Sequence, residues 1–273
     1  MRLPNRTYKA ISLTTLSVSI VAWILLLYNP SHVLGVVHCH VSDAGPSRAS
    51  VEMLLLMNPI SSLLCGWCLM VVAMMLPKLL MPVCFIYSKA LKRRRQIMAL
   101  LFILGYLFAW ALMGIPIVAI MLGSSLTLPG SFVPALVVAT IAFVWQFSPV
   151  KQYCMNKGHE HPYLPAFGWP SFRDTFLFGL KHGIWCIGSG WALMIFPMLL
   201  PDGHHLAMIF VTFVMVTEHL EHPQTPRWRF QLHGRLMRML SAQTQIRIKQ
   251  LRTILATDLN PLSNKRIFKD GIS

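Results

Sequence analysis

The chain has 273 residues, of which 55% are hydrophobic and 12% charged, and its mean hydropathy is +0.57. Because a soluble domain has about 45–50% apolar and 25% charged residues, this composition excludes a soluble monomer, a disordered chain and a disulfide scaffold. Lysine and arginine outnumber aspartate and glutamate by 24 to 9, which gives a formal net charge of +15. In a soluble protein this charge would suggest a nucleic-acid partner. We therefore consider where the positive residues lie along the chain.

Apolar runs of about the length that crosses the hydrocarbon of a bilayer recur along the chain. They predict an all-α fold, a polytopic membrane helix bundle of about six transmembrane helices. The spans are expected at residues 11–28, 60–81, 97–122, 132–147, 175–200 and 206–220. We therefore expect a six-span transmembrane domain over residues 1–222 and a basic cytoplasmic tail over residues 223–273.

Positive charge predicts the orientation, because cytoplasmic flanks of spans retain lysine and arginine. Of the 24 lysines and arginines, 21 lie in the N-terminal segment, the second loop, the polar fourth loop (148–174) and the tail. The first loop carries Arg48 alone. Lys78 and Lys181 lie near predicted cytoplasmic span ends and are expected to snorkel. These positions predict a multi-pass inner-membrane protein with both termini in the cytoplasm. Its partner surface is then lipid with an anionic inner leaflet, and no nucleic acid is expected.

The predicted external loop carries His38, Cys39 and His40. Neutral imidazole and thiolate are ligands that suit copper or zinc, so the loop is a candidate for metal capture. Solvated side chains without a ligand role are the alternative.

The second span brings two thiols and several thioethers into the membrane. Cys65 and Cys68 form a C-x-x-C pair that, on a helix, would be neighbours able to hold a soft ion such as Cu(I). Met70, Met74 and Met81 are expected on one face and would serve as waypoints for such an ion. Buried cysteine and methionine used only for packing are the alternative for both sets.

Further candidate ligands gather near the cytoplasmic ends of the last three spans. The four-residue spacing places His182 and Cys186 on one face of the fifth span. The stripe of Gly179, Gly183 and Gly190 predicts that a neighbouring helix packs closely there. Since the sixth span ends at the same membrane level, we predict one inner metal site. Its candidate ligands are His182, Cys186, Glu218, His219, His222 and Cys154.

The tail between residues 229 and 256 repeats apolar residues at helical spacing among arginines. This pattern fits an amphipathic helix lying on the anionic inner leaflet. A solvated basic tail fits the same residues.

An ordered set of short motifs resembles an uncharacterised bacterial family described as predicted metal-binding integral membrane proteins. The resemblance covers roughly residues 61–221 and implies metal binding but no mechanism. Its motifs are Trp67…Ala73-Met-Met-Leu-Pro77, Gly105-Tyr106…Trp110, Gln146-Phe-Ser-Pro-Val-Lys151-Gln-Tyr-Cys154 and Gly179…His182-Gly183-Ile-Trp-Cys186. Where the family pattern has a second cysteine after the one matching Cys154, this chain has Lys157-Gly158-His159, and where it has a paired Cys-Cys, this chain has Ser189-Gly190. The family's Glu-Lys at the end of the last span becomes Glu218-His219. The resemblance therefore implies a shift from thiolate towards imidazole and carboxylate ligands.

Three functions are compatible with these residues. The leading hypothesis is an integral membrane metal-handling protein, with permease-like transport or delivery of a transition metal; copper is favoured, and zinc or another divalent metal is the alternative. The second is a non-transporting assembly factor for a partner membrane metalloenzyme. The third and least favoured is a membrane oxidoreductase that binds haem or quinone, with His182 and His219 as axial ligands. No hydrolase motif is present, so enzymatic activity is not favoured.

Overall fold

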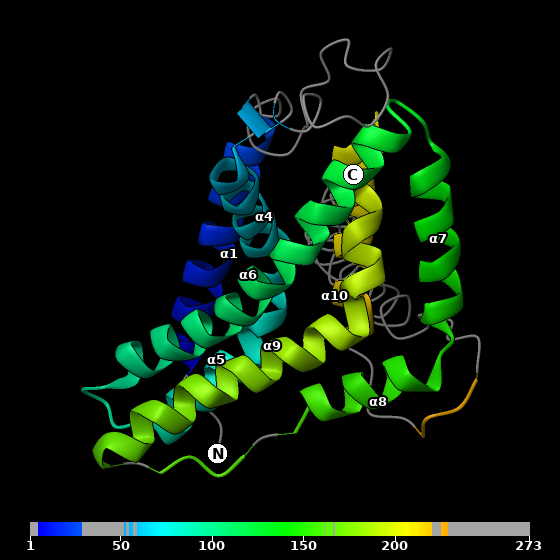
Figure 1. Cartoon of the computed structure of the whole chain (residues 1–273). Helices are drawn as coiled ribbons and strands as arrows, with labels where there is room; N and C mark the ends of the chain where they lie inside the picture. The colour runs from blue at the N-terminus through cyan, green and yellow to red at the C-terminus, as the bar shows by residue number, and fades with distance from the viewer. Residues whose placement is uncertain are drawn as a thin grey trace, which may run out of the picture. The chain divides into compact units, whose positions relative to one another are not determined.

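The computed structural model describes residues 5–28, 52, 55–56, 59–160, 162–165, 167–219 and 225–228. The regular elements of these residues are all helical (Figure 1), in the order α1 (Asn5–Tyr28), α4 (Ile60–Met75), the 3₁₀ turn η2 (Leu76–Leu79), α5 (Leu80–Lys89), α6 (Arg95–Thr127), α7 (Val133–Gln146), α8 (Pro149–Gly158), α9 (Gly168–Met198) and α10 (His204–His219). The all-α class is therefore confirmed for this part of the chain.

The chain divides into two compact units, Met1–Phe230 and Gln231–Ser273. The second unit lies outside the described residues, as does the predicted amphipathic segment of the tail. The predicted boundary between a span domain and a tail at residue 222 stays a prediction.

Three helical stretches are long and apolar enough to cross a membrane, namely Arg6–Tyr28, Ile60–Lys89 and Arg95–Thr127. They coincide with the first three predicted spans. Helices α7 and α8 meet at 71° and add a fourth candidate if this bent pair is one span. Helices α9 and α10 are not among the candidates, and α10 is described over 16 residues, fewer than the roughly 20 needed to cross hydrocarbon. The six-span topology thus stays a prediction.

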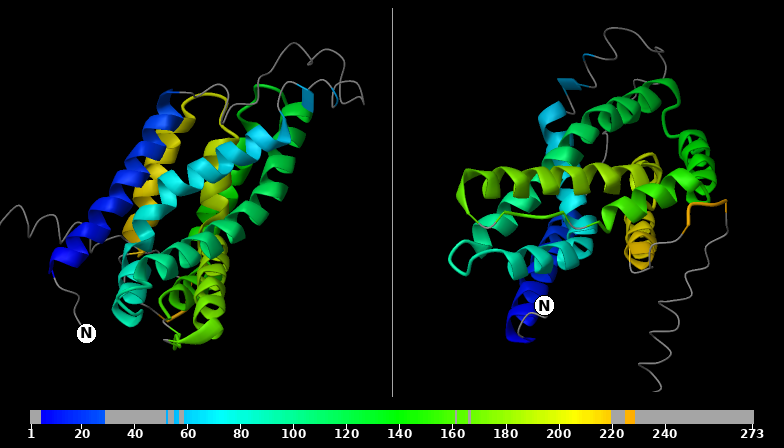
Figure 2. Two further views of the ribbon diagram at one scale, coloured as in Figure 1. Left: turned by 90° about the vertical axis from the view of Figure 1, so that its left-hand side faces the viewer. Right: turned by 90° about the horizontal axis from the view of Figure 1, so that it is seen from below.

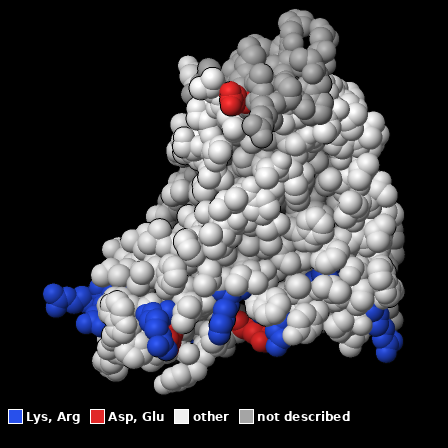
Figure 3. Space-filling view, in the orientation of Figure 1, with Lys and Arg blue, Asp and Glu red and all other residues white. Residues whose placement is uncertain are grey.

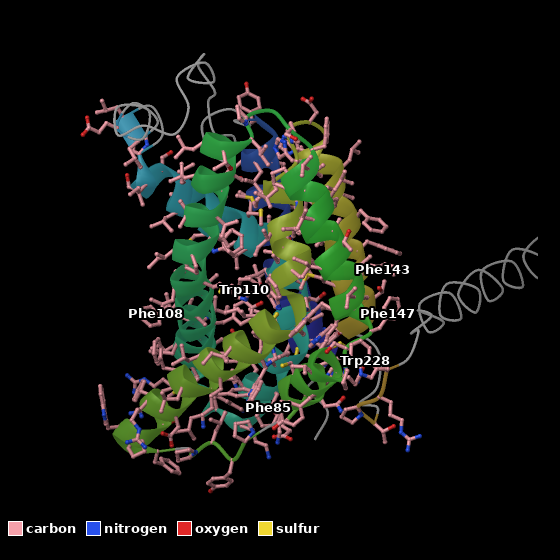
Figure 4. All side chains as sticks on the ribbon, turned by 45° about the vertical axis from the view of Figure 1, so that its right-hand side comes forward. Phe85, Phe108, Trp110, Phe143, Phe147 and Trp228 are labelled. Carbon is pink, nitrogen blue, oxygen red and sulfur yellow. The ribbon has the colours of Figure 1, made fainter. Side chains whose placement is uncertain are left out.

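Large apolar side chains cover the outside of the helices as well as the core. Phe108 of α6 and Phe143 of α7 are 50% and 64% exposed, whereas Trp110 is fully buried between helices (Figure 4). Apolar side chains on the outer face of a helix are favourable where lipid, and not water, surrounds the protein. The described surface therefore suits a bilayer.

The described lysines and arginines gather at one end of the unit Met1–Phe230 (Figure 3). This basic end contains the start of α1, the turn between α5 and α6, helix α8 and the start of α9. Such an asymmetry is the pattern that the positive-inside rule associates with the cytoplasm. The cytoplasmic placement of the termini stays a prediction that follows from this pattern.

The second predicted span is broken by a change of helix geometry. Pro77 lies in η2, after which the chain continues as α5. Proline lacks the amide hydrogen and crowds the preceding turn, so a single continuous helical face does not form. The expected common face of Met70, Met74 and Met81 is therefore wrong, since the first two are fully buried while Met81 is 58% exposed.

Helices α6 and α9 form the most extensive helix contact of the described chain. Gly105 of α6 lies against the backbone carbonyl of Phe176, and Gly179 of α9 lies against that of Phe102. A Cβ at either glycine would collide with backbone, which has nowhere to move. The predicted close approach is confirmed at Gly179 and Gly183, where the neighbouring helix is α6. Gly190, the third glycine of the stripe, lies against the Met215 side chain of α10.

Side-chain hydrogen bonds to backbone carbonyls connect the other helices. Ser19 of α1 donates to the carbonyl of Ala73 at 2.7 Å, and the Trp67 indole of α4 donates to the carbonyl of Trp110 at 2.8 Å. Helix α8 lies beside α9 at the basic end, which the view from below displays (Figure 2, right). This arrangement brings α8, α9 and α10 to one place near the basic end.

Candidate metal centre

A small cavity lies where η2, α8, α9 and α10 meet, and we call it the inner cavity. Its volume is about 20 Å³, which is room for about one water-sized group. The lining residues are Lys78, Leu79, Tyr106, Cys154, Met155, Gly158, His182, Trp185, Cys186, Ser189, Met215, Glu218 and His219.

Five of the six candidate ligands predicted for the inner site line this cavity. They are Cys154, His182, Cys186, Glu218 and His219, which come from α8, α9 and α10. The tertiary structure thus brings together residues that lie up to 65 positions apart in the sequence.

The remaining candidate ligands lie elsewhere. His222 and the loop with His38, Cys39 and His40 are outside the described residues. Cys65 and Cys68 are on α4, where Cys65 is exposed and Cys68 partly buried, and neither lines the inner cavity. The five described cysteines are all free thiols.

Cys186 is the acceptor at the centre of this cavity. The Lys78 ammonium lies 3.5 Å and the Tyr106 hydroxyl 3.2 Å from its Sγ, and both donate to the sulfur. The prediction that Lys78 snorkels is wrong, because the residue is buried. The turn η2 that follows α4 directs this side chain inward, an effect that hydropathy alone does not reveal.

Glu218, which lines the cavity, belongs to a buried ion pair. Lys151 Nζ lies 2.6 Å from Glu218 Oε1, and the side chains are only 4% and 9% exposed. Lys151 falls in a segment predicted as a polar loop, and that prediction is wrong for α8. The Ser148 hydroxyl accepts the amide of Val150 at 3.1 Å and Pro149 is the first helical residue. Serine followed by proline is a helix-start signal that could have revealed α8.

His182 is held in a cage of rings. The centroids of Phe102, Tyr106 and Phe178 lie 5.7, 5.9 and 6.2 Å from the imidazole centroid. The ring of His219 lies 6.4 Å away and nearly perpendicular, at 87°. Aromatic packing of this kind fixes the ring of a buried histidine in one orientation. Two imidazoles from different helices are therefore presented to the same small space.

His159 supports this arrangement but was not among the predicted ligands. Its ring stacks on that of His219 at 5.0 Å and 23°. Its two ring nitrogens lie 2.8 Å from the carbonyl oxygen of Met155 and 3.2 Å from that of His219. Because both nitrogens face backbone carbonyls, His159 holds the end of α10 against α8.

Cys154 reaches the cavity because α9 has no side chain opposite it. A Cβ at Gly188 would lie 2.7 Å from Cys154 Sγ. The indole of Trp145 donates to the carbonyl of Gly188 at 3.1 Å and keeps α7 beside α9. Met215 adds a buried thioether to the same lining. The cavity thus offers thiol, thioether and imidazole groups together.

In this conformation two of the candidate ligands, Cys186 and Glu218, already have hydrogen-bond or ion-pair partners. Within the described ranges, no three histidine, cysteine, aspartate or glutamate side chains are grouped so that they could hold a metal ion. Cys186 accepts from Lys78 and Tyr106, and Glu218 pairs with Lys151. Binding of an ion by Cys186 therefore requires the Lys78 ammonium to move away from the sulfur.

One comparison with known proteins identifies a family. A family model described as "PpoB2: Copper chaperone" matches residues 64–241, more than half of the chain. No curated protein and no solved structure matches the chain. The matched range contains every lining residue of the inner cavity as well as Cys65 and Cys68. The description agrees with the predicted metal-handling class and with the favoured metal, copper.

Proposed function

The chain belongs to the PpoB2 copper chaperone family, and we propose that it is a membrane copper chaperone that carries copper in the inner cavity and delivers it to a partner membrane protein. The observation that supports this most directly is the convergence of Cys154, His182, Cys186 and His219 on one small cavity. Copper is the cargo of this site. The membrane is the cell inner membrane, and the inner cavity faces the cytoplasmic leaflet.

The ligand chemistry favours Cu(I) over zinc. Thiolate and thioether groups are soft ligands that select Cu(I), and Cys186, Cys154 and Met215 supply three sulfur atoms. Structural zinc sites take four nitrogen, sulfur or oxygen ligands in a tetrahedron. The carboxylate of Glu218 is already paired with Lys151, which leaves fewer such ligands for zinc. His182 and Cys186, one helical turn apart, are the proposed core of the site.

Lys78 gives the site a means of releasing its cargo. Its ammonium lies 3.5 Å from the Cys186 sulfur, so a positive charge already occupies the position next to the ligand. Arrival of a copper ion displaces this charge, and return of Lys78 favours departure of the ion, because two cations near one sulfur repel each other. A chaperone needs this exchange, since it must bind the ion without keeping it.

The volume of the inner cavity argues against the haem or quinone alternative. Sites for organic ligands are typically about 300–1,000 Å³, whereas this cavity is about 20 Å³. The family description favours delivery over permease-like transport. In this proposal His38, Cys39 and His40 capture copper outside, and Cys65 and Cys68 act as a handover position on α4.

The test compares Cys186→Ser and His182→Ala with a matched control, Cys84→Ser, which removes a thiol of α5 that does not line the inner cavity. Detergent-purified protein is loaded with Cu(I) without oxygen, passed through size exclusion, and copper is measured per folded protein. Each site variant should lose bound copper, and the double variant should lose little more, since both ligands serve one ion. The control should retain copper.

Full copper occupancy in the double variant would contradict the proposed site. Delivery and transport are separated by reconstituting the wild-type protein into vesicles. A chaperone passes copper to an added acceptor protein without copper crossing the vesicle membrane. Copper flux into sealed vesicles would favour the permease-like alternative.

A further inference from the structure

A second cavity lies at the other end of α9 and α10, and we call it the outer pocket. Its volume is about 180 Å³. It is formed by the end of α6, the start of α7, the end of α9 and the start of α10. Met121, Met198 and His204 are among its lining residues.

His204 lines this pocket and His205 follows it in α10, and each has a buried ring nitrogen that lacks a partner among the described residues. The rings of His204 and His205 lie side by side, with centroids 3.8 Å apart. Nε2 of His204 and Nδ1 of His205 are buried and make no hydrogen bond with any described residue. A buried polar atom without a partner costs about 1–3 kcal/mol. A metal ion coordinated by both nitrogens at the edge of the ring pair would satisfy them at once.

The other groups of the outer pocket select for a soft ion. Met121 and Met198 contribute thioethers to the lining that His204 shares. Thioether ligands select Cu(I) among the common metal ions. No carboxylate occurs among the described lining residues, and hard cations such as Mg²⁺ and Ca²⁺ depend on oxygen ligands of that kind.

We propose that His204 and His205, together with Met121 or Met198, form a second Cu(I) site in the outer pocket. The choice of copper rests on the proposed function. The site lies about 22 Å along α10 from His219, at a rise of 1.5 Å per residue. The pocket is larger than an ion requires, so a ligand of an incoming donor or a receiving protein fits beside the ion. The chaperone would thus hold copper at both ends of α10.

The experiment titrates Cu(I) into the full-length protein in detergent against a coloured Cu(I) chelator. Four proteins are compared: the wild type, the outer variant His204→Phe/His205→Phe, the inner variant His182→Ala/Cys186→Ala, and the combination. Phenylalanine preserves the paired rings and removes the nitrogens. We expect the outer variant and the inner variant each to bind one ion fewer than the wild type, and the combination to bind two fewer. His233→Phe, in the tail, is the matched control and should bind as many ions as the wild type.

The outcomes separate this proposal from the proposed function. An unchanged number of ions in the outer variant would overturn the outer site and leave the inner one intact. An unchanged number in the inner variant, together with the loss of one ion in the outer variant, would overturn the inner site and support the outer one. If the outer variant does not fold, Met121→Leu and Met198→Leu, which nearly conserve volume, take its place. At least one should weaken one of the Cu(I) affinities, and unchanged affinities in both would overturn the proposal.

Discussion

At the scale of single residues, two ion pairs of nearly equal length differ only in their surroundings. Lys151 and Glu218 are 2.6 Å apart with side chains 4% and 9% exposed, whereas Lys157 and Glu160 are 2.7 Å apart with side chains 34% and 64% exposed. Removing one partner of a buried pair leaves an uncompensated charge in a medium of low dielectric constant. Solvent screens the exposed pair. The two pairs should therefore respond very differently to substitution.

We expect Glu218→Gln to lower the free energy of unfolding by about 3–5 kcal/mol, because Lys151 would then be buried without a counter-charge. The double variant Lys151→Met/Glu218→Gln should lose much less, since it buries no charge. Glu160→Gln is the control and should change the free energy of unfolding by less than about 1 kcal/mol. Unfolding in mixed micelles measures all three. Equal effects of Glu218→Gln and Glu160→Gln would contradict the buried pair.

At the scale of whole elements, glycines determine how closely α6 and α9 approach. A Cβ at Gly179 of α9 would collide with the backbone carbonyl of Phe102 of α6. A Cβ at Gly123, near the end of α6, would meet nothing within 4 Å. Small residues at such a crossing let helix backbones pack directly against each other. His182 and Cys186 follow Gly179 on the same helix, so this contact also sets the position of the proposed copper ligands.

Gly179→Ala should therefore destabilise the protein by about 1–3 kcal/mol, as overpacking does in a tight core, and should also reduce bound copper. Gly123→Ala is the matched control. It should be neutral or stabilise the protein by up to about 1 kcal/mol, because alanine loses less backbone entropy in a helix. Thermal unfolding in detergent, with copper measured on the folded fraction, compares the two. A stable Gly179→Ala with full copper would argue against the close contact.

At the scale of the whole molecule, the distribution of charge predicts the topology. We expect single cysteines at Lys92 and at Lys157 to be labelled from the cytoplasmic side, and one at Asp202 from the opposite side. All three positions are described residues, and Lys92 and Asp202 are exposed. The background lacks native thiols, and an impermeant maleimide is applied to oriented membranes before and after permeabilisation.

Asp202 is the most informative position, because it lies between α9 and α10, which are not among the candidate spans. Labelling of Asp202→Cys and Lys92→Cys from the same side would overturn the six-span topology. It would also place the outer pocket and the inner cavity on one side of the membrane. Labelling of Lys157→Cys from the same side as Asp202→Cys would mean that α7 and α8 do not bring the chain back to the cytoplasmic side, contrary to the prediction.

The helical class and the first three candidate spans could be predicted from the sequence, and so could five side chains that line the inner cavity. Hydropathy and the 3.6-residue period are local properties, so they identify apolar helices. They also place His182 and Cys186 on one helical face. The predicted order of the spans led us to expect Cys154, Glu218 and His219 at a common depth, because alternating helices return to the same membrane level. In the structure these three residues line one cavity.

The surroundings of these side chains could not be predicted from the sequence. The inward turn of Lys78, the pairing of Lys151 with Glu218 and the stacking of His159 on His219 join residues up to 108 positions from their partners. These interactions arise where different helices contact each other, and the residue pattern of a single helix does not predict such contacts. The outer pocket was missed for the same reason. Whether the nitrogens of His204 and His205 are buried depends on how the ends of α6 and α9 meet the start of α10, which no local period encodes.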